Sequence, residues 1–119
     1  DGITSQEISK IAKQLNVEDR ILELKNGFFT MIESEKDLSG GQRQIINLCR
    51  AFLKPASVVL LDEPTSSQSS DMEDKILQGI KAISAEKLCV IVTHSDKVKK
   101  IADLTYVIQE KKLKRVSGE

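Results

Sequence analysis

Apolar residues in the first part of the chain recur at helical spacing. Ile8, Ile11 and Leu15 follow one another at intervals of three and four residues, which predicts an amphipathic helix. Thr4 with Glu7 three residues later has the pattern of a capping box at the start of that helix. A second short helical segment is expected over residues 19–24, and residues 28–37 show no regular period.

The strongest helical pattern covers residues 40–53, and Pro55 prevents its continuation. One apolar stripe runs along it, made of Ile45, Leu48, Cys49 and Phe52 and widened by Ile46 and Leu53. Arg43, Gln44 and Arg50 form the polar side. We therefore expect one face of this helix to pack on the core.

Two continuous apolar runs lack helical periodicity, at residues 58–61 and 88–93. The first run is expected for a strand that is buried on both faces, and the second, rich in β-branched residues, is expected for another strand. A helix is expected between them over about residues 71–86, with Ser70 and Glu73 as its capping box. A short helix near 97–102 and a hairpin of residues 104–108 and 113–116 follow. The alternation of strands and helices predicts an α/β domain with parallel strands.

Composition and net charge indicate a chain with one domain core and do not point to a particular binding partner. The chain has 119 residues with 39% apolar content, enough for one domain core, and its 18 basic and 18 acidic residues balance. That balance gives no reason to propose nucleic acid or an acidic membrane surface as a partner. No apolar run approaches the roughly 20 residues of a membrane span. Cys49 and Cys89 lie in apolar stretches and are expected to be buried free thiols in a reducing compartment.

The stretch Leu38-Ser39-Gly40-Gly41-Gln42 precedes the strongest helix. A serine and two glycines at a helix N-terminus expose backbone N–H groups, and the helix dipole favours an anion there. The plain structural alternative is an N-cap serine followed by two loop glycines.

Two further groups of polar residues end the predicted strands. Asp62 and Glu63 follow the first strand, and His94, the single histidine, follows the second. Ligands of α/β folds bind at the carboxyl ends of strands. There Asp62 suits Mg²⁺, Glu63 suits proton abstraction from water, and His94 suits a bond to phosphate. Taken singly, each of these features is more often structural.

In combination these motifs resemble those of ABC-type ATPases over nearly the whole chain. Residues 38–42 are similar to the family's signature loop, 58–63 to its Walker B strand with the following glutamate, and 92–95 to its His switch. Residues 24–30 resemble, more loosely, the segment before the signature in exporter-type domains. The resemblance implies a partial P-loop ATPase sheet core at residues 55–119 and a small helical subdomain with the signature loop at residues 1–54.

The resemblance also implies roles for individual residues. Asp62 would bind Mg²⁺ directly or through water, Glu63 would be the general base, and His94 would contact the γ-phosphate of ATP. Ser39, Gly40, Gly41 and Gln42 would contact ATP held by a second ATPase domain in a head-to-tail dimer. A transmembrane permease segment would be the other partner, which places the domain at the cytoplasmic face of a membrane.

Two departures from the family pattern matter. The loop after Walker B usually reads Ser-Ala-Leu-Asp, and here Ser69 takes the place of its aspartate. No Gly-x-x-x-x-Gly-Lys-Ser/Thr string occurs, so the loop that cradles ATP phosphates is absent, as is the family's glutamine loop. We therefore expect a fragment of a longer chain with negligible ATPase activity alone. The strand at residues 88–93 would lack its P-loop neighbour, which predicts self-association or marginal stability.

Two alternative functions stay open at this stage. Chromosome-structure and DNA-repair ATPases carry the same three motifs on a half without the P-loop, although this chain has neither heptads nor a basic patch. A non-catalytic interaction module is the other alternative, and the serine at position 69 is the feature that favours it.

Overall fold

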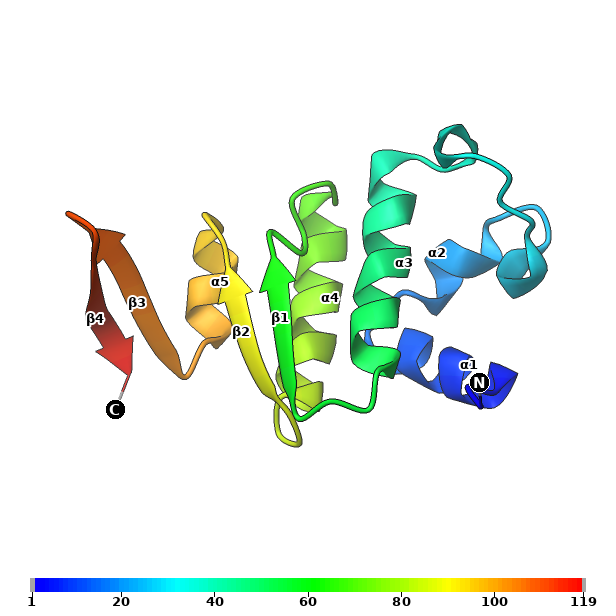
Figure 1. Ribbon diagram of the computed structural model, residues 1–119. Helices are drawn as coiled ribbons and strands as arrows, with labels where there is room; N and C mark the ends of the chain where they lie inside the picture. The colour runs from blue at the N-terminus through cyan, green and yellow to red at the C-terminus, as the bar shows by residue number, and fades with distance from the viewer. Residues whose placement is uncertain (1, 119) are drawn as a thin grey trace.

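The computed structural model describes residues 2–118, which form an elongated molecule of 46 × 28 × 25 Å (Figure 1). Helices gather towards the N-terminal end and a hairpin forms the C-terminal end. In chain order the elements are α1 (Ser5–Gln14), α2 (Glu18–Leu22), the 3-10 turns η1 (Gly27–Phe29) and η2 (Glu35–Asp37), α3 (Gly40–Leu53), β1 (Val58–Asp62), α4 (Ser70–Ile83), β2 (Leu88–Val92), α5 (Asp96–Ile101), β3 (Leu104–Gln109) and β4 (Lys112–Gly118).

The helix starts follow the local sequence in two of the three longest helices. Thr4 and Glu7 form the predicted capping box of α1, and α3 begins at Gly40 after the N-cap Ser39. The capping box predicted for Ser70 and Glu73 is wrong. The N-cap of α4 is Ser69, whose Oγ accepts a hydrogen bond from the Met72 amide at 3.2 Å, so Ser70 is already helical. The shift by one residue frees the Glu73 carboxylate for other partners.

The strands form two separate two-stranded sheets. β1 and β2 are parallel, in register from Val58 opposite Leu88 to Asp62 opposite Val92, with α4 as the crossover between them. β3 and β4 form the predicted antiparallel hairpin. Its two turn residues, Glu110 and Lys111, both have positive φ (49° and 63°), as the hairpin turn that matches strand twist requires. The parallel arrangement is therefore confined to β1 and β2 in the described residues.

One hydrophobic core joins the helical N-terminal part to β1. It contains side chains of α1, α2, α3, α4, α5 and one face of β1: Ala12, Leu15, Val17, Ile21, Ile45, Leu48, Cys49, Phe52, Val59, Leu61, Ile76, Leu77, Ile80 and Val98. Both cysteines are free, but only Cys49 is buried as expected, since Cys89 is partly exposed. Burial raises the pKa of the Cys49 thiol to about 11. Because this core crosses residue 54, the division into two subdomains there stays a prediction.

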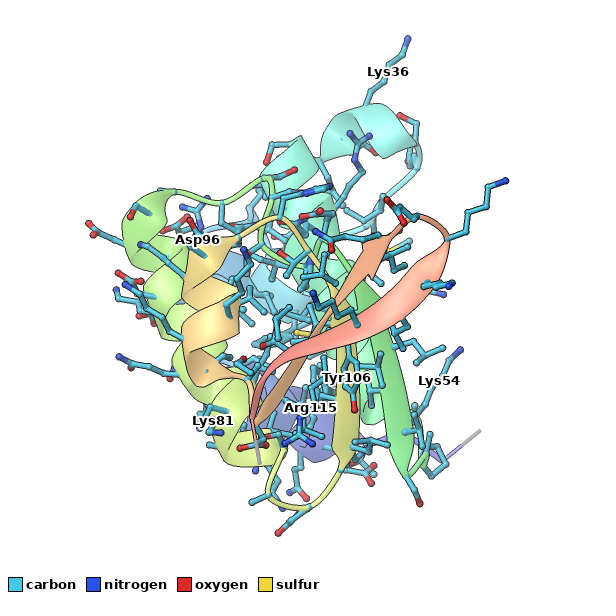
Figure 2. All side chains as sticks on the ribbon, turned by 90° about the vertical axis from the view of Figure 1, so that its left-hand side faces the viewer. Lys36, Lys54, Lys81, Asp96, Tyr106 and Arg115 are labelled. Carbon is cyan, nitrogen blue, oxygen red and sulfur yellow. The ribbon has the colours of Figure 1, made fainter. Side chains whose placement is uncertain are left out.

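The expectation that the strand at residues 58–61 is buried on both faces is wrong for this chain, and the second strand is likewise exposed on one face. Val59 and Leu61 face the core, whereas Leu60 of β1 and Val92 of β2 are 73% and 63% exposed. Figure 2 shows α4 and α5 on the same side of the two strands. Within residues 2–118 no helix covers the other side. The exposed residues of this face, called here the open face, are Val58, Leu60, Leu88, Val90 and Val92.

Helices α1 and α4 approach each other at Gly79. A Cβ built on Gly79 would lie 2.4 Å from the Gln14 carbonyl oxygen and 2.7 Å from the Leu15 Cα, both backbone atoms. Asn16, just beyond α1, has a positive φ of 60° and donates a hydrogen bond from Nδ2 to the Lys75 carbonyl at 2.8 Å. The absence of a side chain at Gly79 thus fixes how α1 sits on α4.

The described part of the chain includes no helix with the length and apolar content needed to cross a membrane.

Candidate functional site

The carboxyl ends of β1 and β2 bring two predicted site residues together. Asp62 lies opposite Val92, and the Glu63 amide donates a hydrogen bond to the Val92 carbonyl at 2.8 Å. This bond extends the ladder by one residue, and the chain then turns sharply. Glu63 has a φ of 47°, a conformation that costs a non-glycine residue about 1–3 kcal/mol and recurs at functional sites.

The carboxylate of Glu63 and the ring of His94 face each other at this edge. Glu63 Oε1 lies 3.9 Å from His94 Nε2, and the His94 side chain is fully exposed while that of Glu63 is 35% exposed. The separation is longer than a direct hydrogen bond, so both groups can bond to a third molecule. The pair carries opposite charges only when His94 is protonated. A partly buried carboxylate acceptor beside an exposed imidazole suits proton transfer and phosphate contact.

The predicted anion site at the start of α3 is already partly satisfied within the chain. The Ser39 hydroxyl accepts from the Gln42 amide at 3.1 Å, and the Gln42 side-chain oxygen accepts from the Ser39 amide at 2.8 Å. This reciprocal pair uses two of the backbone donors. The amides of Gly40 and Gly41 lie in the first turn, where a helix supplies no acceptor. Those two amides are the donors best suited to an anion.

Gln44 links α3 to the loop that follows Glu63, a contact that the sequence analysis did not predict. Its Nε2 donates to the Glu63 carbonyl at 2.9 Å and to the Ser66 hydroxyl at 3.0 Å. Its Oε1 accepts from the Ser67 amide at 3.0 Å. The sequence indicated this contact only through spacing. Gln44 lies three or four residues after the two glycines, and residues at that spacing lie on the same side of a helix. Gln44 therefore holds the backbone of the candidate base.

Gly41 allows the loop of residues 66–68 to lie directly against α3. A Cβ on Gly41 would stand 3.0 Å from the Ser67 carbonyl oxygen. Gln68 Nε2 donates to the Gly41 carbonyl and to Gln44 Oε1, at 3.0 Å in both cases. In the described part of the chain no hydrogen bond joins Ser39 or Gln42 directly to Asp62, Glu63 or His94. The two groups of predicted site residues are connected through Gln44 and Gln68.

The position of Asp62 suits a metal ion that binds together with a phosphate-bearing substrate. It is exposed at the end of β1, next to Glu63. Among residues 2–118 no three His, Cys, Asp or Glu side chains gather closely enough to hold a metal ion by themselves. Mg²⁺ commonly takes one or two carboxylates and completes its shell with water and substrate phosphates. A single exposed carboxylate at this edge is consistent with that kind of site.

Comparison with known proteins tests the resemblance stated from the motifs. The family model described as ABC transporter matches residues 3–66. The chain belongs to the ABC transporter family. The match includes the signature loop, the Walker B strand and the glutamate at position 63.

Curated relatives of this ABC chain share much of its sequence. A probable ABC transporter ATP-binding/permease protein of Haemophilus influenzae is 42% identical over 101 residues, 84% of this chain. The ATP-dependent lipid A-core flippase of Pseudoalteromonas translucida is 37% identical over 107 residues, 89% of this chain. The chain spans only 18% of the length of each of these two relatives.

A solved structure agrees with the fold. A bacterial Atm1-family ABC exporter with ATP bound matches 95% of this ABC chain with a TM-score of 0.84 at 25% identity. The chain covers 20% of that protein. The α/β fold class with a parallel pair of strands is thereby confirmed as that of an ABC ATPase, and the relatives named above are transport proteins rather than chromosomal ATPases.

Proposed function

We propose that this chain is the signature-bearing part of the ATP-binding domain of an exporter-type ABC transporter. The observation that carries the proposal is the pair Glu63 and His94, held 3.9 Å apart at the carboxyl ends of adjacent parallel strands. The parent protein would couple ATP hydrolysis to movement of a solute across a membrane. Its domain would lie at the cytoplasmic face, next to a permease segment.

Each site residue has a role that its geometry allows. Glu63, anchored through its backbone by Gln44, is the general base that accepts a proton from the attacking water. His94, exposed beside it, hydrogen-bonds the terminal phosphate of the substrate ATP. Asp62 binds Mg²⁺, which when bound neutralises charge on the phosphates. Phosphoryl transfer depends mainly on positioning and charge, so fixed backbone geometry at Glu63 serves the reaction.

The signature residues serve a different nucleotide. Ser39, Gly40, Gly41 and Gln42 contact ATP held by the second ATPase domain of a head-to-tail pair. The first-turn amides of Gly40 and Gly41 supply donors that helix geometry leaves without acceptors. The Ser39 hydroxyl and the Gln42 side-chain oxygen each accept a bond from the other residue's amide, which leaves the Ser39 O–H and the Gln42 side-chain N–H groups as donors for the nucleotide.

The open face supports the idea that further sequence belongs on this sheet. Five apolar side chains of β1 and β2 are exposed there, and within residues 2–118 β2 pairs with β1 alone. In ABC ATPases the P-loop strand lies beside the His-switch strand. We propose that a P-loop-containing part of the domain pairs with β2, and that without it the chain binds ATP weakly and self-associates.

The test compares ATP hydrolysis by the chain alone with hydrolysis after it is joined to a P-loop-containing half-domain from one of the relatives. We expect no turnover alone, turnover in the joined protein, and a loss of about 10²–10⁴-fold in Glu63→Gln. Micromolar ATP affinity of the chain alone would contradict the need for the second half.

Glu110→Gln is the matched control for this test. It makes the same chemical change at a glutamate whose φ of 49° is close to that of Glu63, but in the hairpin turn. We expect its turnover to equal that of the unmodified joined protein. Equal turnover in Glu63→Gln would instead remove Glu63 as the base. A folded joined protein without any turnover would favour the non-catalytic alternative.

A further inference from the structure

The loops that follow β1 and β2 meet at one carboxylate, that of Glu73 in the first turn of α4. Glu73 Oε2 accepts a hydrogen bond from Thr65 Oγ1 at 2.5 Å and another from Ser95 Oγ at 3.1 Å. Thr65 is buried and Glu73 partly so. Thr65 lies two residues after Glu63, and Ser95 directly follows His94. One oxygen atom thus bonds to both segments that carry the proposed base and the proposed phosphate ligand.

A second link attaches the histidine segment to the same turn of α4. Lys97 Nζ lies 2.9 Å from Asp74 Oδ1 and donates to the Ser70 carbonyl at 3.2 Å. The bend at His94 is itself closed by a bond from the Ser95 amide to the Thr93 hydroxyl at 2.9 Å. The backbone on both sides of His94 is therefore held, although its ring is fully exposed. On the C-terminal side of His94, the side chain of Ser95 is held by its bond to Glu73.

We propose that Glu73 is a positioning residue that sets the placement of His94 relative to Glu63. This inference rests on the proposed function of that pair, and it assigns to Glu73 no contact with the nucleotide. The Glu73 oxygen accepts from both hydroxyls, with a shorter bond to Thr65 than to Ser95, and so fixes the angle between the two segments that bear them. Because a displacement of about 1 Å can cost about 10²-fold in rate, this angle matters for catalysis.

The alternative is that Glu73 only stabilises the first turn of α4 through its charge. Substitutions of Glu73 can distinguish the two roles, because both hydroxyls bond to the same carboxylate oxygen of this residue. Glutamine keeps an oxygen acceptor at that point and removes the charge, whereas alanine removes both. A positioning role predicts that Glu73→Gln rescues most of what Glu73→Ala loses. Asp71, exposed in the same turn, provides the matched control for charge and helix stability.

The first measurement is NMR of the 119-residue chain, in which His94 is the only histidine. We expect the imidazole resonances of His94 to shift and broaden in Glu73→Ala, to stay near their original positions in Glu73→Gln, and to be unchanged in Asp71→Ala. Unchanged His94 resonances in a folded Glu73→Ala chain would overturn the proposal. Equal changes of the His94 resonances in Glu73→Ala and Asp71→Ala would also overturn it, because the charge at the start of α4 would then explain both.

The second measurement is ATP turnover in the joined protein described above. We expect Glu73→Ala to lower kcat by about 10- to 100-fold with little change in KM, and Glu73→Gln to restore most of the loss. A rise in KM with kcat unchanged would overturn the positioning role. If the unmodified joined protein shows no turnover, the proposed function fails while the His94 resonances still decide the role of Glu73.

Ser95→Ala covers the case in which Glu73→Ala does not fold. It removes one of the two bonds and leaves Thr65 bonded to Glu73. We expect a smaller shift of the His94 resonances in the same direction as in Glu73→Ala. No shift in Ser95→Ala would overturn the proposal.

Discussion

The two faces of the β1–β2 pair are both largely apolar in sequence but have opposite environments. On one face Val59 and Leu61 are buried against helices, and on the other Leu60 and Val92 are mostly exposed. The difference arises because α3, α4 and α5 all belong to the same side of the strands. The apolar sequence of a strand therefore predicts burial on both faces. Each face is buried only where another layer of the structure packs on it. Substitutions in the buried core and on the two faces of the strands test whether this difference holds in solution.

Phe52→Ala tests the helical side at its deepest point. Phe52 is among the largest fully buried side chains, and truncation leaves a cavity, so we expect a loss of about 3–5 kcal/mol in the free energy of unfolding. Urea denaturation followed by circular dichroism measures it. Phe29→Ala is the control, because Phe29 is exposed in η1. Equal losses in the two variants would mean that the core is not where the packing places it.

Gly79→Ala tests the contact between α1 and α4. The added Cβ would overlap backbone atoms of Gln14 and Leu15, which have no side-chain freedom to move away. We expect a loss of about 1–3 kcal/mol in the free energy of unfolding, although alanine is the better helix former. Gln78→Ala, at the neighbouring exposed position, is the control and is expected to be neutral or slightly stabilising. A stabilised Gly79→Ala chain would show that α1 does not pack there.

Leu60→Thr and Leu61→Thr compare the two faces at adjacent positions of one strand. Leu60 is exposed, so we expect a change within about 0.5 kcal/mol in the free energy of unfolding and weaker self-association. Leu61 is buried, and threonine there loses apolar volume and places a hydroxyl in the core. Sedimentation velocity measures association and urea denaturation measures stability. If Leu60→Thr destabilised the chain as much as Leu61→Thr, the open face would be covered in solution.

Glu7→Gln tests the smallest effect, at the exposed capping box of α1. A backbone hydrogen bond from Thr4, supported by one from its hydroxyl, lowers the pKa of Glu7 below its ordinary value of 4.5. A lowered folded-state pKa contributes stability above the unfolded value, and that contribution disappears as the pH falls through the folded value. Glutamine keeps the box and cannot titrate. We expect slightly less acid-induced loss of stability in Glu7→Gln than in the unmodified chain, measured by urea midpoints below pH 4.5.

Local patterns predicted most elements and the order of the motifs. The stripe of α3, the capping box of α1 and the hairpin around Glu110 all arise from contacts a few residues apart, which local sequence encodes. The start of α4 was predicted one residue late, because Ser69 and Ser70 are equivalent in sequence and the geometry of the preceding loop selected Ser69.

The residues of the candidate site could be named from the sequence, because the signature, acidic and histidine motifs are each contiguous. How these residues are held could be seen only in the folded chain. Gln44 reaches 19 residues along the chain to the Glu63 carbonyl, and Glu73 reaches 22 residues to Ser95. Gly79 meets α1 across a still larger separation. The physical reason is that such contacts depend on how finished elements pack together, and no local pattern of polar and apolar residues carries that information.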